Sequence, residues 1–188
     1  NTGNLIIVHR EMVPVSVFEN RRLELMRLYK VVASVHDVYP YTTDVMRICD
    51  NDQHAYGAVF STSKTPEMFT LQEKTENAEA GRLNLRLLKV NRTRVLDELR
   101  DRFKAGTVIM QKQHDTDRYQ DHYTSLKRVQ VFEKDELVFQ WVKTDGEDHM
   151  MFSMMYLYLA IMQKGRLSGW TALNAVPLVR RFTLKQNL

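Results

Sequence analysis

The sequence predicts a single domain of the α/β class, and three observations support this. The chain of 188 residues, 44% of them hydrophobic, is long enough for one sizeable core. Apolar, β-branched runs alternate along it with segments whose apolar positions recur at helical spacing. Elements that alternate in this way build helices onto a sheet. We therefore expect residues 1–188 to form one domain.

The chain opens with a predicted strand and a predicted helix. Residues 5–13 are apolar and β-branched, and they follow a TGN turn of the kind that closes a hairpin. This strand is expected to pair with one upstream, so we expect the chain to lack its first strand or strands. Apolar positions at helical spacing then predict a helix over residues 16–30, with Ser16 as its N-cap.

A second strand and a second helix come next. Residues 31–35 predict a short buried strand that ends at His36 and Asp37. Pro40 ends this strand, because proline lacks the N–H that a sheet needs. A helix is predicted over residues 41–49, started by one of its two threonines.

The middle of the chain continues the alternation. Strands are predicted over residues 56–61, 83–90 and 107–110, and an amphipathic helix over residues 92–104. The polar segment 61–81 has no clear hydrophobic period, so we interpret it as a surface excursion.

The last third of the chain predicts a hairpin and a buried helix. Residues 128–132 and 137–142 are strand-like and are joined by the polar turn EKDE. An almost wholly apolar helix is predicted over residues 148–163, with its methionines as core residues. Residues 164–188 form a basic C-terminal segment with five Lys or Arg and no Asp or Glu.

Composition limits the classes of function. The formal net charge of +4 permits a polyanionic partner without requiring one. The single cysteine, Cys49, excludes an internal disulfide, which fits a reducing compartment, and we expect it in the core. The longest apolar run, residues 150–162, is too short for a transmembrane helix, so we expect no membrane contact.

Asp148 is the first candidate functional residue. It stands at the predicted start of the last helix, where a carboxylate can accept backbone N–H bonds and interact with the helix dipole. A structural cap is therefore one interpretation. Asp145 and Glu147 crowd the same place, although a cap needs only one side chain. A cation sharing the site would reduce the repulsion between these carboxylates.

Asp37 is the second candidate. It ends a predicted strand, at the edge where loops of an open α/β sheet build sites, although a structural turn residue also suits this position. Together with Asp148 it would supply hard oxygen ligands for a divalent cation. Such ions activate water and stabilise the attacking and leaving oxygens in phosphodiester cleavage.

Several segments of the chain carry a family resemblance. These are VHDVYPY (residues 35–41), YTSLKR (123–128) and WVK (141–143), then Asp148-His149 and a tyrosine-rich helix that includes YLYLA (156–160). In order and approximate spacing they resemble the C-terminal nuclease domain of tailed-bacteriophage terminase large subunits, over most of the chain. The most specific piece is the tryptophan-lysine strand that leads into Asp-His and the helix.

The resemblance implies an RNase H-like fold, a mixed central sheet flanked by helices, and a Mg²⁺- or Mn²⁺-dependent endonuclease that cuts concatemeric double-stranded DNA during packaging. Such domains use three acidic residues: Asp37 fits the second role and Asp148 the third. The first has no counterpart here, because in the family it lies on a strand upstream of residues 5–13. The implied partners are DNA, an N-terminal ATPase domain, the small terminase subunit and the portal protein, in the cytoplasm of a bacterial host.

Positive side chains are expected to hold the DNA backbone. The resemblance puts Lys127, Arg128 and Lys143 near the acidic site. Arg92 belongs to a basic stretch, residues 82–104, that could track phosphates or could equally be a salt-bridged helix face. His149, Asp145 and Glu147 are possible accessory residues at the metal site.

Three functions stay open from the sequence. The first is a metal-dependent endonuclease with Asp37 and Asp148 as ligands. The second is a catalytically incomplete RNase H-like module that binds DNA or the portal through basic surfaces. The third is an unrelated α/β interaction domain in which both aspartates are cap and turn residues.

Overall fold

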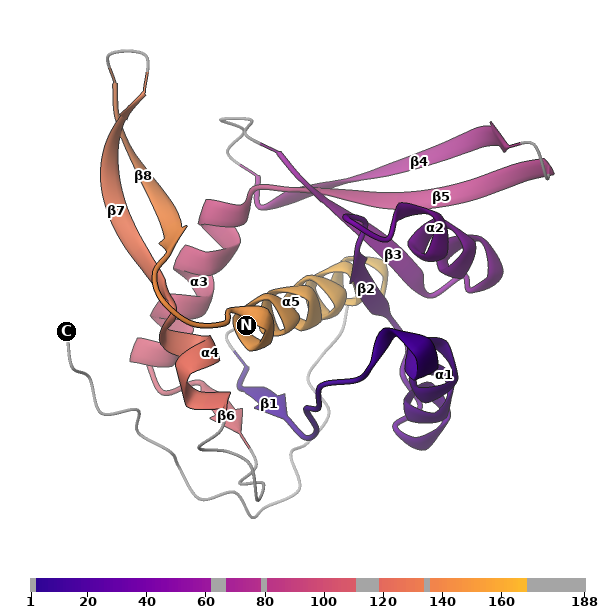
Figure 1. Ribbon diagram of the computed structural model, residues 1–188, viewed down its shortest axis with the longest axis horizontal. Helices are drawn as coiled ribbons and strands as arrows, with labels where there is room; N and C mark the ends of the chain where they lie inside the picture. Colours follow the sequence, from indigo (N-terminus) through magenta and orange to yellow (C-terminus); the bar gives the residue numbers. More distant parts are fainter. Residues whose placement is uncertain (1–2, 62–66, 79–80, 111–118, 134–135, 169–188) are drawn as a thin grey trace.

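The computed structural model describes residues 3–61, 67–78, 81–110, 119–133 and 136–168. In these residues the chain is a mixed α/β protein with helices on both faces of a mixed sheet (Figure 1). The helices are η1 (Val15–Val17, a 3₁₀ turn), α1 (Phe18–Leu28), α2 (Thr42–Asn51), α3 (Arg92–Lys104), α4 (Gln120–Thr124) and α5 (His149–Ser168).

The main sheet has four strands in the order β2-β3-β5-β4. The first three run parallel, and β4 is antiparallel to β5 along its whole length. Parallel neighbouring strands have their carboxyl ends on the same side of the sheet. Side chains from different strands can meet there. The bounds are β2 (Ser34–Asp37), β3 (Ala55–Phe60), β4 (Phe69–Ala78) and β5 (Gly81–Val90).

Side-chain alternation on β3 divides the core into two layers. Tyr56 and Ala58 belong to the larger cluster, which contains residues of α3 and α5. Ala55 belongs to a smaller cluster built on α2, and Val59 packs against it. Successive side chains of a strand point to opposite faces, so α2 covers one face of the sheet while α3 and α5 cover the other.

Two further strand pairs complete the fold. β1 (Leu5–Ile7) runs parallel to β6 (Val108–Met110), and β7 (Leu126–Glu133) forms an antiparallel hairpin with β8 (Glu136–Lys143). The hairpin projects from the body of the molecule beside α3 (Figure 1). It confirms the predicted hairpin, and α3 confirms the predicted helix 92–104.

Helix α5 lies at the centre of the molecule (Figure 1) and contacts β2, α3 and α4. Its methionines are core residues as predicted, and Met155 is fully buried. Cys49 is also fully buried, and its burial raises the pKa of the thiol to about 11. Among the residues that the structure describes, no helix has the length and hydrophobicity that a membrane span requires.

Three predictions about local structure are wrong. The polar segment 61–81 is not an irregular excursion, since it contains all of β4. The first strand ends at Ile7, well before residue 13, and its observed partner is the parallel strand β6. Ser16 is not a helix cap, because it lies inside the 3₁₀ turn in which the Val17 N–H donates to the Pro14 carbonyl.

The second strand and second helix also begin differently from the prediction. Lys30 has a positive φ of 49°, and the Val31 N–H donates to the Met26 carbonyl, so this segment closes the end of α1 before β2 starts. At the start of α2, the Thr42 hydroxyl donates to the Val38 carbonyl 3.1 Å away. No side-chain cap bond is present at the N-cap, Tyr41.

Candidate functional site

Asp37 lies at the carboxyl edge of the parallel strands. It is the last residue of β2, and in the register of the sheet it is level with Ala58, two residues before the end of β3. Its Oδ1 accepts the backbone N–H of Tyr39 at 3.1 Å, which is the turn interaction expected of an aspartate here. The other carboxylate oxygen, Oδ2, has a partner from another element.

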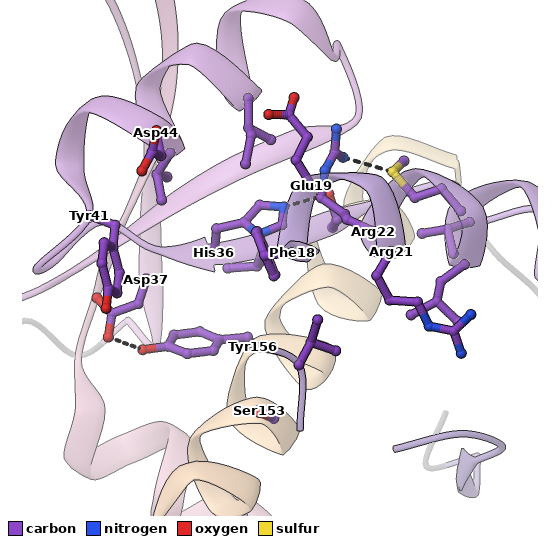
Figure 2. A pocket seen from close by; sticks show the side chains of 18 of the residues that line it. Phe18, Glu19, Arg21, Arg22, His36, Asp37, Tyr41, Asp44, Ser153 and Tyr156 are labelled. Carbon is purple, nitrogen blue, oxygen red and sulfur yellow. Dashed lines mark hydrogen bonds between the residues drawn. The ribbon is translucent and has the colours of Figure 1, made fainter. Parts of the chain in front are cut away.

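Tyr156 of α5 donates its hydroxyl to Oδ2 of Asp37 at 2.6 Å (Figure 2). The bond joins residues 119 positions apart and links α5 to the end of β2. Burial raises the pKa of Tyr156 far above its usual value, and the bond to Asp37 raises it further. The phenol therefore remains a proton donor at physiological pH.

Three other residues affect this tyrosine. Its ring stacks on Phe60, the last residue of β3, with centroids 6.3 Å apart. Arg92, just beyond the end of β5, holds its guanidinium over the Phe60 ring and lowers the Tyr156 pKa, opposing the effect of burial. The charge of Asp148 raises the same pKa. Asp37, Arg92 and Asp148 thus all act electrostatically on one side chain.

Asp148 immediately precedes α5, as predicted. Its backbone carbonyl accepts the N–H of Phe152, and its side chain is largely buried, with 15% exposed. The carboxylate Oδ1 is 3.5 Å from the ammonium of Lys143, at the end of β8. The carboxylate therefore has a cation beside it, which a structural helix cap alone does not require.

Glu147 and His149 flank Asp148. One ligand atom from each of these three residues lies within 4.8 Å of the others, the only such group of three or more His, Cys, Asp or Glu in the described ranges. The His149 Nε2 is 2.8 Å from Glu147 Oε2, and the ring faces that of His122 at 6.1 Å. Asp145 is exposed on the connecting loop. His149 is thus exposed and within ion-pair distance of Glu147.

Two of the predicted DNA-binding residues differ in their surroundings. Arg128 makes a two-pronged bond to Asp97 of α3, at 2.8 and 3.2 Å, and its guanidinium stacks 3.8 Å above the Phe139 ring. Lys127, the preceding residue on β7, is exposed. Arg128 has a clear structural role, while Lys127 is available to a phosphate.

Part of the basic stretch on α3 is a salt-bridged helix face. Arg100 contacts Asp97 and Asp101, and Arg102 bonds Glu98 at 2.9 Å. On β5, Arg86 donates to the backbone carbonyls of Cys49, Asp52 and Ala55, and so ties β5 to the end of α2. Three of the basic side chains of this stretch, Arg86, Arg100 and Arg102, are therefore used internally.

A cavity of about 840 Å³ opens beside the free side of β2 (Figure 2). All four residues of β2 line it, together with η1, α1, α2 and one face of α5. His36 is partly buried next to Asp37, and the loss of water around its ring lowers its pKa to about 4, so the ring is neutral. Its Nε2 lies 3.1 Å from the Ser34 hydroxyl.

The structure brings some predicted residues together and leaves others apart. Asp37 accepts the Tyr156 hydroxyl, Arg92 lies over the Phe60 ring on which Tyr156 stacks, and Lys143 adjoins Asp148. Arg128 is directed to Asp97 instead. The residues predicted from the sequence do not include Tyr156, although a tyrosine inside an apolar helix needs a partner for its hydroxyl, and this was an available signal.

Comparisons of the chain with protein-family models, with curated proteins and with solved structures found no match.

Proposed function

We propose that this chain is an RNase H-like, Mg²⁺- or Mn²⁺-dependent endonuclease domain of a viral DNA-packaging terminase, working on concatemeric double-stranded DNA in the cytoplasm of a bacterial host. Asp37 and Asp148 are the proposed metal ligands. An N-terminal ATPase domain, a small terminase subunit and a portal protein are the proposed partners.

One observation carries the proposal. The two carboxylates selected from the sequence, one at a strand end and one 111 positions later, are both tied to α5: Asp37 accepts the hydroxyl of Tyr156 in this helix, and Asp148 directly precedes it. A turn residue and a helix cap with unrelated structural roles need not be linked through one helix. Asp37 also lies at the carboxyl ends of the parallel strands, where open α/β sheets bind ligands, which supports a shared site.

The donor set fits the metal ions that the resemblance implies. Carboxylate oxygens are hard ligands, which Mg²⁺ and Mn²⁺ prefer over nitrogen or sulfur. Asp37 and Asp148 would hold the ion, with Glu147 and His149 as accessory groups. A bound ion of this type would polarise the scissile phosphate and lower the pKa of water.

Positive side chains near the carboxylates support a phosphate-binding role. Arg92 is exposed beside Tyr156, and Lys143 is half-exposed beside Asp148. Both side chains are exposed enough to reach toward a phosphate. Lys127 adds a third exposed cation on β7. Contacts of this kind hold the DNA backbone without reading its sequence.

Plasmid cleavage and metal binding together test the proposal. Wild type, Asp37→Asn, Asp148→Asn and the control Asp101→Asn would be incubated with supercoiled plasmid and Mn²⁺, and Mn²⁺ binding would be measured separately. We expect metal-dependent nicking that either site variant abolishes and Asp101→Asn retains, because Asp101 is exposed and its side chain pairs only with Arg100 among the described contacts. Unchanged Mn²⁺ affinity in both site variants would contradict the proposal.

The position of Lys143 favours a second candidate function. Its ammonium lies 3.5 Å from the Asp148 carboxylate, where it can replace a metal ion as the balancing charge. The chain would then be a binding module that grips DNA or the portal without cutting. This candidate predicts salt-dependent DNA binding that does not change when EDTA removes divalent ions.

A further inference from the structure

The Asp37 carboxylate is held from two sides. The Tyr39 backbone N–H bonds one oxygen at 3.1 Å, and the Tyr156 hydroxyl bonds the other at 2.6 Å. An ionised carboxylate has about four acceptor positions, so roughly two remain open after these bonds. The two donors fix the plane of the group and thus the direction in which the open positions point.

The hydroxyl of Tyr156 is itself fixed. The ring stacks on Phe60 with an interplanar angle of 27°, and it also contacts Phe152, one turn earlier on α5. A tyrosine side chain has only two rotatable bonds before the ring, so stacking leaves the hydroxyl little freedom. Tyr156 is therefore a rigid donor. Its position is set by Phe60 at the end of β3 and by Phe152 in α5.

The same helix carries the second carboxylate. Asp148 directly precedes α5, and Tyr156 lies about two turns further along it, since an α-helix has about 3.6 residues per turn. The bond from Tyr156 to Asp37 consequently joins β2 to the helix that follows Asp148. A shift of α5 along β2 would break this bond.

We propose that Tyr156 is a positioning residue that holds the Asp37 carboxylate in the orientation needed to bind a divalent cation together with Asp148. This inference rests on the proposed function. Outer hydrogen bonds of this kind orient a metal ligand, and their loss typically weakens metal binding by about 10- to 100-fold. Tyr156 contacts neither the ion nor the DNA in this role.

The test compares two tyrosines of one helix. Tyr156→Phe removes only the hydroxyl that reaches Asp37, and Tyr158→Phe removes one that lies 3.3 Å from Glu98. Mn²⁺ would be titrated into the full chain while the electron paramagnetic resonance signal of the free ion is followed. We expect Tyr156→Phe to weaken Mn²⁺ binding about 10-fold or more, and Tyr158→Phe to leave it within a factor of about 2.

The outcomes separate the inference from the function on which it rests. If Asp37→Asn weakens binding while Tyr156→Phe and Tyr158→Phe both match wild type, the positioning role is overturned and the metal site stands. If Asp37→Asn and Asp148→Asn both bind as wild type does, or wild type does not bind, both proposals fail. Thermal unfolding of each variant reports any loss of fold.

A double variant keeps the test decisive if Tyr156→Phe also lowers stability. When Tyr156 acts through Asp37, adding Tyr156→Phe to Asp37→Asn costs no further affinity. Independent losses that multiply in the double variant would show that Tyr156 affects binding by another route, and the positioning role would be overturned.

Discussion

Gly57 lies in β3, between β2 and β5, and side chains from both sides come close to the position that a Cβ would occupy. A Cβ at this position would lie 2.8 Å from Val38 Cγ2 and 2.9 Å from Leu87 Cδ2, closer than real Cβ atoms approach. Val38 is buried, so it cannot move freely aside. The absence of a side chain at Gly57 therefore allows β2 and β5 to pack closely against β3 over α2.

Gly57→Ala is expected to lower the free energy of unfolding by about 1–3 kcal/mol, the usual cost of overpacking a core. Urea denaturation measures this. Gly165→Ala is the matched control, because nothing lies within 4 Å of its Cβ position in α5, and alanine in a helix is favoured by about 0.5–1 kcal/mol. Equal stability of the two variants would contradict the close packing around Gly57.

At the residue scale the sequence predicted which carboxylates are candidate functional residues, but it did not predict which side chains lie beside them. Asp37 and Asp148 could be selected because each stands at the end or start of an element. Tyr156 and Tyr158 are indistinguishable in the sequence YLYLA, yet one bonds Asp37 and the other lies against Glu98 and Arg102. Only the packing of α5 against β2 and α3 separates their roles.

At the scale of elements, Asp97 of α3 fastens the β7–β8 hairpin to the body. Its Oδ1 accepts bonds from Arg128 of β7 at 2.8 Å and from the indole N–H of Trp141 of β8 at 3.0 Å. Trp141 is buried, so its N–H has little access to water. One carboxylate thus holds both strands of the hairpin against one helix.

Asp97→Ala is expected to loosen the hairpin and to lower stability by about 1–3 kcal/mol, because it leaves a charged donor and an indole N–H without an acceptor. Hydrogen exchange should become faster in the amides of β7 and β8 and stay slow in β3 and β5. Asp101→Ala, one turn later and exposed, should change stability by less than about 1 kcal/mol. Unchanged exchange in the hairpin would argue against this anchor.

Periodicity predicted the elements that have one apolar face. α3 buries Val95, Leu96 and Leu99 and begins with Asn91, whose side chain accepts the Arg94 N–H, so its bounds could be read directly. β4 could not, because most of its residues are polar and no apolar alternation continues through it. Its strand conformation comes from ten paired positions with β5, which depend on the backbone rather than on side-chain hydrophobicity.

At the scale of the whole molecule, α1 is the least firmly packed long helix. It has no buried residue, whereas α2 and α3 each bury three side chains. The cavity of about 840 Å³ lies between α1 and the rest of the molecule. Two ion pairs hold α1 in place instead. Arg22 pairs with Asp52 at 3.0 Å, and Glu19 pairs with Arg47 at 2.6 Å.

The backbone amides of α1 are therefore expected to exchange their hydrogens faster than those of α3. Amides of α1 should exchange through local opening, with protection several-fold to many-fold below that of α3, because little apolar surface is exposed when α1 detaches. Asp52→Ala should speed exchange in α1 further, because it removes the partner of Arg22. Equal protection of α1 and α3 would contradict this order.

The fold class could be predicted as a whole, since the alternation of strands and helices led directly to a mixed α/β protein. The strand order could not. Residues 5–7 pair with residues 108–110, and residues 34–37 with residues 55–58, and nothing local in these short segments specifies a partner. Which strands pair depends on how the helices pack against the sheet.

The central position of α5 has a consequence for synthesis of the chain. Met151, Met155 and Leu159 of this helix belong to the cluster that joins β1, β3 and β5 with α3, so the main core contains residues from both ends of the described chain. Contacts of such long sequence separation form late. Before α5 is added, the face of the sheet that α3 and α5 share is covered by α3 alone. The core closes only when α5 packs beside α3, and until then apolar side chains of the sheet stay exposed and prone to aggregation.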